Sequence, residues 1–241
     1  MRHFPPGFAR QTSFYGELAP WYPLLTPAHE YAGEANALQA MLGNAKRVLE
    51  LGCGAGHLAS HLVDVDLVLT DISPEMLALS KRLNTAVPHH LGDMRHLRLD
   101  QRFDAVFAHD AVCYLHSEAD LAALAKTAAA HLSPGGVFIA LPDYVAETLN
   151  AGVDDGGEDG PSGDGLRYLE WLTPDPEGPL YSVHYALMVR DSTGRVEVYK
   201  DHHREAAHPT AAWVYALEQA GLAVEVLNDE WREVVFRGTR L

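Results

Sequence analysis

Three glycines at alternate positions follow an apolar run, and this spacing is typical of a turn that cradles a nucleotide. Residues 47–51 read as a buried strand, Gly52, Gly54 and Gly56 as the turn, and residues 57–62 as the start of a helix. Glycine lets the backbone approach a ligand closely, and a helix start offers unpaired N–H groups. This stretch therefore predicts a site for a nucleotide-like ligand.

The position of the third glycine limits which nucleotide the turn suits. A dinucleotide fingerprint, G-x-G-x-x-G, would place that glycine at position 57, where the chain has histidine. The motif found is instead E-x-G-x-G-x-G, beginning at Glu50. This spacing disfavours an NAD-dependent oxidoreductase, and a glycine-rich turn without any ligand stays open as an alternative.

Two acidic residues follow later strands at positions that suit ligand contacts. Asp71 ends a predicted strand, residues 67–71, and an acid at that place can accept hydrogen bonds from both ribose hydroxyls. Asp93 follows Gly92 after a short third strand. The alternative for Asp71 is that it only caps its loop.

Histidines and one further acid are the candidates for proton transfer. His109 and Asp110 stand at the end of the predicted strand 103–110, where ligands bind in open α/β sheets. His203 lies on a later hairpin, and histidine is the natural base near neutral pH. The histidine clusters lack cysteine support and zinc-like spacing, so we expect no metal site.

The remaining pattern alternates strands and helices and then becomes less regular. Residues 26–42, 73–83, 117–132 and 210–222 read as helices, and 137–142, 223–227 and 233–237 as strands. Residues 153–165 are rich in glycine and acids, which predicts a mobile loop. Strict alternation over 181–190, a turn, and a returning strand at 196–200 predict a hairpin.

The ordered motifs across residues 47–142 resemble the class I S-adenosylmethionine-dependent methyltransferases. The glycine motif, Asp71, the Gly92–Asp93–Met94 stretch, F-D-x-V at 103–106 and L-x-P-G-G at 132–136 all match in order. The resemblance implies an α/β fold: a Rossmann-like, doubly wound sheet of about seven strands with an antiparallel last strand. It also implies S-adenosylmethionine as the cofactor.

The inserted hairpin resembles a branch of that superfamily which contains glycine N-methyltransferase and the nucleotide-sugar N,N-dimethyltransferases. In that branch a small antiparallel sheet covers the pocket, and a tyrosine of the N-terminal segment lies near the cofactor. Tyr22 matches that tyrosine, although Pro23 replaces the acid that often follows. The implied cofactor-binding residues are Tyr22, Glu50, Gly52, Cys53, Gly54, Gly56, Asp71, Ile72, Met76, Asp93, Met94 and His109. The candidate catalytic residues are His109, Asp110 and His203.

The resemblance further implies one methyltransferase domain over residues 1–241. We expect an N-terminal arm and lid helix at 1–44 and a cofactor-binding core at 45–143 and 205–241. Residues 144–204 would hold the acidic loop and the inserted hairpin. The expected activity is methyl transfer to a small polar metabolite, at nitrogen or oxygen, held between the N-terminal aromatics and the hairpin; a catalytically silent cofactor-binding protein stays open.

Composition restricts the partners. The 241 residues carry a net charge of −15, and a nucleic-acid partner would require a basic surface. No apolar run approaches the roughly 20 residues of a membrane span, so no membrane partner is expected. Two cysteines imply no disulfide framework, which favours the cytoplasm. A small-molecule substrate is expected, and a homodimer is left open.

Overall fold

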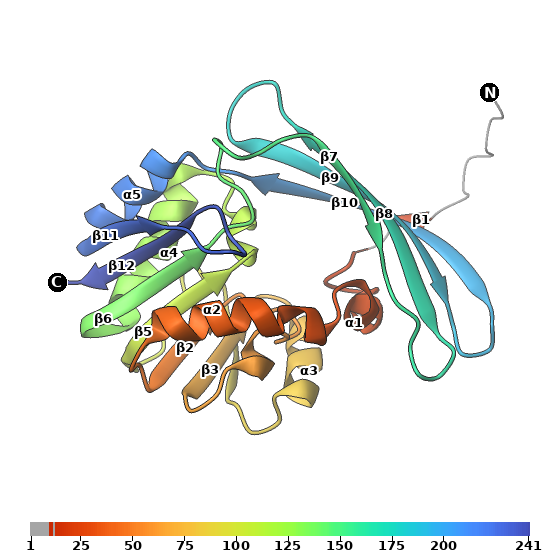
Figure 1. The fold of residues 1–241 in the computed structure, drawn as a ribbon, viewed down its shortest axis with the longest axis horizontal. Coiled ribbons are helices and arrows are strands. Elements are labelled where there is room, and N and C mark those ends of the chain that lie inside the picture. The colour runs from red at the N-terminus through yellow and green to blue at the C-terminus, as the bar shows by residue number, and fades with distance from the viewer. Residues whose placement is uncertain (1–9, 12) are drawn as a thin grey trace.

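The computed structural model describes residues 10, 11 and 13–241, and it builds two sheets. Residues 1–9 and 12 of the expected arm, including Phe4 and Phe8, lie outside the described part. A seven-stranded sheet fills one half of the molecule, and a five-stranded sheet arches away from it in the other half (Figure 1). In the described residues no helix is long and apolar enough to cross a membrane.

The seven-stranded sheet has the order β11-β12-β6-β5-β2-β3-β4. Its strands are β2 (Arg47–Leu51), β3 (Asp66–Asp71), β4 (His89–Leu91), β5 (Phe103–His109), β6 (Leu132–Leu141), β11 (Leu222–Leu227) and β12 (Val235–Arg240). All neighbours pair in parallel except β12, which is antiparallel to both β6 and β11. The predicted doubly wound sheet with an antiparallel last strand is thereby confirmed.

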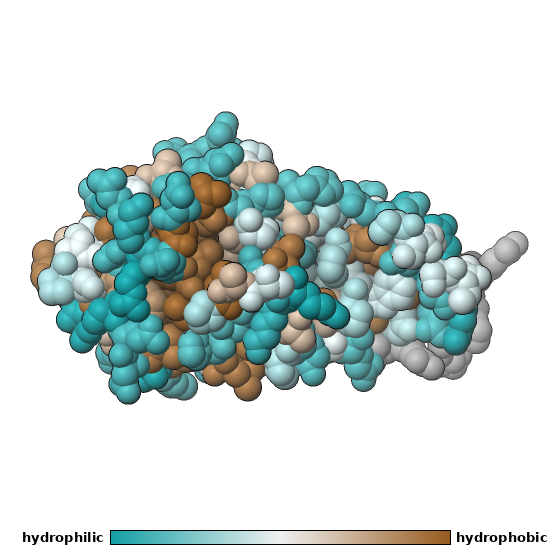
Figure 2. Space-filling model, turned by 90° about the horizontal axis from the view of Figure 1, so that it is seen from below, coloured by the Kyte–Doolittle hydropathy of each residue, from teal (hydrophilic) through white to brown (hydrophobic). Residues whose placement is uncertain are grey.

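Helices cover both faces of this sheet. The helices α4 (Glu118–His131) and α5 (Thr210–Gln219) pack on one face through residues such as Leu124 and Trp213. On the other face lie α2 (Ala32–Leu42) and α3 (Pro74–Leu83), with Leu38 and Leu77 in the core. Seen from below, hydrophobic residues gather over this half of the molecule, while the other half is mostly polar (Figure 2).

Serine side chains cap the starts of two of the predicted helices. The Ser73 hydroxyl accepts from the Met76 N–H at 3.1 Å at the start of α3, and Pro74 follows it. At the start of α4, the Ser117 hydroxyl accepts from the Asp120 N–H at 3.1 Å. Such side-chain caps satisfy backbone donors that have no partner within the helix. They set where each helix begins relative to the strand before it.

The prediction of an α-helix directly after the glycine turn is wrong. Only a single 3₁₀ turn forms there, η3 (Ala59–His61), and Leu62 already has extended backbone angles. β3 begins at Asp66, so too few residues remain for an α-helix. The His61 ring also bonds the Ala28 carbonyl at 2.7 Å, which fixes this short connection against the residues just before α2.

The second sheet is larger than the predicted hairpin. It has the order β1-β10-β9-β8-β7 and pairs the expected strands, β9 (Leu180–Arg190) and β10 (Val196–Ala206), with three more. These are β1 (Arg10–Gln11), β7 (Gly152–Gly156) and β8 (Gly165–Pro174). The prediction of a loop at 153–165 is therefore wrong for residues 153–156, which pair with β8 as an edge strand.

Short helical turns join the two halves. The N-terminal segment forms η1 (Ala19–Trp21), α1 (Tyr22–Leu25) and η2 (Ala28–Tyr31) before α2. Phe14 and Leu18 are buried with Leu187 and Tyr199 of the five-stranded sheet, so this segment packs beneath that sheet. Tyr15 and Tyr22 pack beside Ala55 and Met76 of the other half. The segment thus bridges the glycine turn and the second sheet.

Candidate active site

A cavity of about 610 Å³ lies between the two halves of the molecule, at the carboxyl ends of the parallel strands. Its floor comes from the ends of β2, β3 and β5 and from the residues just after β4 and β6, and its roof from the inner face of β8, β9 and β10. Most of the sequence-predicted site residues line it: Tyr22, Glu50, Gly52, Cys53, Gly54, Asp71, Ile72, Met76, Asp93, Met94, His109 and Asp110. Gly56 and His203 are not on its wall.

The glycine turn is held against the end of β3. The N–H groups of Gly52 and Cys53 both donate to the Thr70 carbonyl at 2.8 Å. Gly52 has φ +81°, and a Cβ there would approach the Ala111 Cβ to 2.6 Å. This position therefore needs glycine for both its backbone angle and the space beside it. The cradle keeps the backbone itself on the cavity wall.

Gly56 serves a different purpose from the other two glycines. It has φ +72°, and a Cβ would meet Ser80 Oγ at 2.3 Å and Asn84 Nδ2 at 2.4 Å. Its carbonyl accepts from Asn84 Nδ2 at 3.0 Å. Gly56 therefore allows α3 and the residue after it to pack closely against the turn, and it does not touch the cavity.

Two buried carboxyl groups stand beside the turn. Asp71 is 8% exposed and accepts from the N–H groups of Gly54 at 2.7 Å and Ser73 at 2.8 Å; burial raises its pKa. Glu50 is 2% exposed, and its Oε2 has no hydrogen-bond partner among the described residues. Burial, Asp71 and Asp110 raise the pKa of Glu50 to about 8. An unpaired buried carboxyl on a cavity wall is a polar group that a bound ligand can satisfy.

Asp93 belongs to a surface ion-pair group at the rim of the cavity. Its carboxylate binds Arg95 Nη2 at 2.6 Å, and Arg95 also reaches Asp120 Oδ1 at 3.0 Å. The hydrogen bond from Arg95 lowers the pKa of Asp93. Ile72 stands nearby with its side chain 65% exposed, an unusual exposure for isoleucine, and it faces the open cavity. A flat apolar group could cover it.

His109 lies in a buried charge cluster that the sequence did not reveal. Its Nε2 is 2.7 Å from Arg232 Nη2 and 3.0 Å from Glu34 Oε2, and its Nδ1 is 3.2 Å from Asp110 Oδ2. Both ring nitrogens therefore already have protein partners. Asp110 itself has φ +40°, a strained backbone for a residue other than glycine, and this turns its carboxylate toward the cluster.

Arg232 is the centre of this cluster. It is 9% exposed and binds Glu34 at 2.5 Å, Asp110 at 2.5 Å and Asp143 at 3.3 Å. Burial alone would raise the pKa of Glu34, but the hydrogen bonds and charges of His109 and Arg232 lower it to about 2. Burial and the neighbouring Asp110 raise the pKa of Asp143. Arg232 stands in an irregular connection between β11 and β12, so no periodic signal could have found it.

His203 lies behind the cavity wall. Its Nδ1 is 2.7 Å from the Tyr114 hydroxyl, and its Nε2 is 3.1 Å from Asp201 Oδ2. Burial would lower its pKa, yet the hydrogen bonds to Asp201 and Glu205 raise it to about 9. The ring is therefore charged at neutral pH and has no proton-accepting nitrogen free. This placement does not favour the role of base that we assigned to His203 from the sequence.

Tyrosines form much of the roof and the connecting wall. Tyr114 donates to the Tyr15 hydroxyl at 2.9 Å, and the two rings meet edge to face with centroids 5.7 Å apart. Burial raises the pKa of both phenols, so they stay neutral and can donate hydrogen bonds. Tyr181 and Tyr185 face the same space from β9. The sequence indicated Tyr22 but not this ring of phenols.

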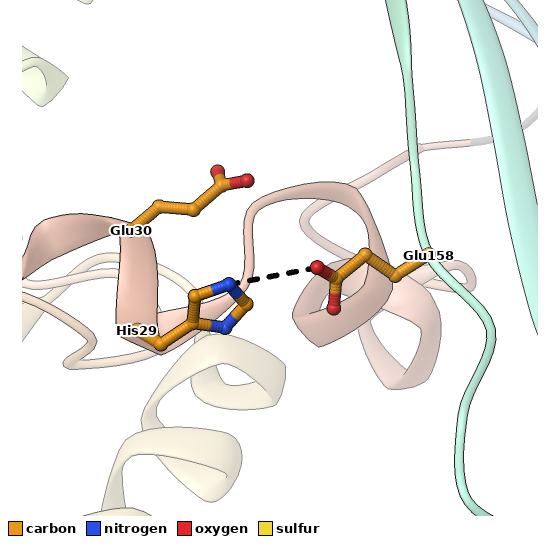
Figure 3. Close-up of side chains that lie close together, drawn as sticks. All are labelled: His29, Glu30 and Glu158. Carbon is orange, nitrogen blue, oxygen red and sulfur yellow. Dashed lines mark ion pairs between the residues drawn. The ribbon is translucent and has the colours of Figure 1, made fainter.

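A group of metal-ligand types occurs outside the cavity. His29 Nε2 lies 3.6 Å from Glu158 Oε1, with Glu30 beside them (Figure 3). The His29 side chain is 71% exposed, and none of the three residues lines the cavity. The group ties η2 to the connection after β7 by an ordinary surface ion pair, which contributes little to stability.

The chain is similar in sequence to known methyltransferases. Residues 48–136 match the family model of a methyltransferase domain. The chain is 28% identical over 236 residues, covering 94% of it and 92% of the relative, to a dTDP-3-amino-3,6-dideoxy-α-D-glucopyranose N,N-dimethyltransferase of Streptomyces fradiae.

Solved structures agree with that relative. The crystal structure of DesVI from Streptomyces venezuelae matches with a TM-score of 0.83 at 26% identity, covering 93% of this chain and 99% of that one. The sugar N-methyltransferase KedS8 from Streptoalloteichus matches with a TM-score of 0.79 at 25% identity, with 99% of each chain covered. The likeness therefore includes the second sheet as well as the glycine turn.

Proposed function

Because the chain is a class I S-adenosylmethionine-dependent methyltransferase, we propose that it transfers a methyl group to the amino group of a small hydroxylated acceptor. Two of the relatives named above are named as an N,N-dimethyltransferase and a sugar N-methyltransferase, and they cover 94% and 99% of this chain. The choice of nitrogen over oxygen rests on the two histidines that the sequence offered as bases, because His109 and His203 each have protein partners on both ring nitrogens.

The residues present fit the cofactor. The turn at Gly52 and Gly54 leaves no side chain between backbone and ligand, and Asp71 has acceptor capacity beyond its two backbone donors. Ile72 offers an exposed apolar face. The unpaired Glu50 carboxyl suits the positive end of the cofactor. We therefore propose that the cofactor is held by the residues just named together with Cys53, Met76, Asp93, Met94 and Tyr22. Gly56 contributes indirectly, because it lets α3 pack closely against the glycine turn.

For methyl transfer, the main task of the protein is to position the acceptor relative to the methyl group. When bound, S-adenosylmethionine supplies an electrophilic methyl group on a sulfonium. The chain aligns the acceptor nitrogen with that carbon, and good alignment alone can contribute roughly 7–11 kcal/mol to lowering the barrier. A carbon–nitrogen bond forms as the carbon–sulfur bond breaks. An acceptor that arrives as an ammonium first loses one proton to an acceptor group in the cavity.

The preference for a nitrogen acceptor follows from the hydrogen-bond partners of His109 and His203. An alcohol is too weak a nucleophile unless a base removes its proton, and histidine usually does this. Here His109 has partners on both nitrogens, and His203 lies behind Tyr114. A neutral amine needs no such base. The carboxylate of Asp110 lines the cavity and can take the proton of an ammonium, so we assign that role to Asp110.

A paired panel tests this proposal. The full chain is incubated with methyl-labelled S-adenosylmethionine and with amino sugars, each matched to the sugar that has a hydroxyl at the same carbon. We expect label in the amines only, located on nitrogen by mass spectrometry. Equal or preferential labelling of the hydroxyl partners would contradict the proposal.

We also propose that the enzyme works in the cytoplasm as a homodimer. Both cysteines are free and buried, which suits a reducing compartment. The outer face of the five-stranded sheet exposes large side chains, among them Trp171 at 58% and Met188 at 52%. On this proposal a second copy of the chain covers these side chains.

A further inference from the structure

We propose that His203 is a positioning residue for methyl transfer: through Tyr114 it holds the Tyr15 hydroxyl as a hydrogen-bond donor to an oxygen atom of the acceptor. The inference rests on the proposed function and deepens it, because it names a device that orients the acceptor. It concerns the acceptor chamber, which we define as the part of the cavity beneath the roof. The chamber is lined by Tyr15, Asp110, Tyr114, Asp143, Tyr144 and Glu205.

A series of hydrogen bonds leads from β10 to the acceptor chamber. Asp201 Oδ2 lies 3.1 Å from His203 Nε2, and His203 Nδ1 lies 2.7 Å from the Tyr114 hydroxyl. The Tyr114 hydroxyl in turn lies 2.9 Å from the Tyr15 hydroxyl. The members come from β10, from η4 (Ala111–Tyr114) after β5, and from the N-terminal segment. We call the series His203, Tyr114 and Tyr15 the tyrosine relay.

The surroundings of His203 keep both of its ring nitrogens protonated at neutral pH. Ionisable groups lie around the ring on the N-terminal segment, η4, β8, β9 and β10: Tyr15, Tyr114, Glu170, Tyr185, Asp201 and Glu205. Burial would lower the pKa of His203, but Asp201 and Glu205 raise it to about 9. Burial would raise the pKa of Asp201, but the hydrogen bond from His203 lowers it. The two side chains therefore form a charged pair.

A doubly protonated His203 fixes the direction of the hydrogen bonds that follow it. Its Nδ1–H donates to the Tyr114 oxygen, so the Tyr114 hydrogen needs another acceptor. Two oxygens lie near it, the Tyr15 hydroxyl at 2.9 Å and Glu205 Oε1 at 3.3 Å. A hydroxyl donates over about 2.5–3.0 Å, and over shorter distances still to a carboxylate. Tyr114 therefore donates to Tyr15.

Tyr15 is left with a hydrogen to donate. Within the described part of the chain, Tyr114 is the only hydrogen-bond partner of its hydroxyl. Burial raises the pKa of Tyr15, so the phenol keeps its proton. The Tyr15 carbonyl accepts from Ser73 Oγ at 2.7 Å on the side of the glycine turn, whereas the hydroxyl lies beside Tyr114 under the roof. The hydrogen is therefore offered to the acceptor chamber.

Loss of one proton from His203 reverses the tyrosine relay. A neutral ring that keeps its Nε2–H for Asp201 becomes an acceptor at Nδ1. Tyr114 then donates to His203 and accepts from Tyr15. The Tyr15 oxygen turns a lone pair toward the acceptor chamber in place of a hydrogen. His203 thus acts on the acceptor without touching it.

Nuclear magnetic resonance of the full chain tests the relay without any acceptor. Tyrosine isotopically labelled at Cζ reports the hydrogen bonding of each phenol oxygen, and Tyr15→Phe identifies the Tyr15 signal. As the pH rises, the Tyr15 signal should move with the same midpoint as the His203 ring signal, near pH 9. In Tyr114→Phe the ring should still titrate while the Tyr15 signal stays unmoved. An unmoved Tyr15 signal in the unsubstituted protein, or a moving one in Tyr114→Phe, would overturn the inference.

Turnover shows whether the hydrogen reaches the acceptor. The probe is the amino sugar of the paired panel that is methylated fastest. Tyr15→Phe, Tyr114→Phe and His203→Gln should each raise KM about fivefold with little change in kcat, the loss of one hydrogen bond to the bound acceptor. Double variants should raise KM no further, because the relay is already broken. Additive losses, or an unchanged KM in Tyr15→Phe, would overturn the inference.

His29→Gln is the matched control for the histidine variant. His29 also pairs with a carboxyl group, that of Glu158, but its side chain is 71% exposed and lies outside the cavity, so KM should not change. Weaker S-adenosylhomocysteine binding in Tyr15→Phe, with KM for the acceptor unchanged, would place the hydrogen at the cofactor and contradict the inference. Absence of methylation at nitrogen would remove the proposed function, and the resonance titration would still decide the relay.

Discussion

Asp71 and Glu50 show how two similar acids beside one turn acquire different states. Asp71 accepts two backbone N–H groups, which favour its charged form against the opposing effect of burial. Glu50 has an unpartnered Oε2, and burial with two neighbouring acids raises its pKa to about 8. On our proposal, the remaining lone pairs of Asp71 accept from the ribose hydroxyls, and Glu50 contacts a positive or hydrogen-bond-donating group of the cofactor.

Replacing Asp71 with Ala should weaken S-adenosylhomocysteine binding by about 1–3 kcal/mol, because a charged hydrogen-bond acceptor is lost. Calorimetric titration measures the change. Asp66→Ala is the matched control, since Asp66 lies exposed at the opposite end of the same strand. An unchanged affinity in the Asp71 variant, with folding verified by circular dichroism, would count against the assigned ribose contact.

His203 makes stability depend on pH above neutrality. Its pKa is raised from 6.5 to about 9 in the folded state, so the folded protein binds its proton more tightly. The stabilisation is complete below pH 6.5 and is lost as the pH rises through 9, by roughly 2–3 kcal/mol. Denaturant unfolding between pH 6.5 and 9.5 should show this decline. His203→Gln should flatten it, and an equally steep decline in that variant would refute the assignment.

At the scale of elements, local patterns predicted what a few neighbouring residues decide. The caps at Ser73 and Ser117, the strands of the first sheet and the alternation along β9 are all set locally. The sequence did not predict β7, because β7 forms by pairing with β8, which is distant in local pattern. The exposed, glycine-rich residues of β7 themselves are typical of a loop. The role of Arg232 was not predicted for a similar reason, since its partners Glu34, Asp110 and Asp143 come from three distant segments.

The packing of α3 on the glycine turn can be tested at Gly56. Gly56→Ala adds an unfavourable left-handed residue and a clash with Ser80, so we expect a loss of roughly 2–4 kcal/mol in unfolding free energy. Gly135→Ala is the control, because Gly135 has φ +76° but open space around its Cβ, and should lose only about 1 kcal/mol. Equal losses in chemical denaturation would show that the close packing contributes nothing.

On the scale of the whole molecule, the cavity exists only because two sheets meet. The first sheet supplies the glycine turn and the acids at its strand ends, and the second supplies the roof (Figure 1). The segment from Phe14 to Leu25 connects them: the Phe14 N–H donates to Asp201 Oδ2 at 2.6 Å, and Ser73 Oγ donates to the Tyr15 carbonyl at 2.7 Å. The sequence predicted the strand-end acids, but not how the second sheet would meet them.

The outer face of the second sheet predicts self-association. Trp171 of β8 lies in register with His184 of β9, which stacks on His202 of β10 at 4.4 Å between ring centroids. Trp171→Glu should convert a dimer to a monomer in light scattering. Tyr215→Glu is the control, because Tyr215 is 64% exposed on α5, away from this face. A protein that is monomeric before any substitution would contradict the prediction.

A crystal structure of the full chain with S-adenosylhomocysteine tests the central claim most directly. We predict that the ribose hydroxyls bond Asp71, that the adenine covers Ile72, and that the sulfur faces the acceptor chamber beside Asp110 and Asp143. Electron density for the ligand elsewhere, or a sulfur directed away from that chamber, would contradict the account.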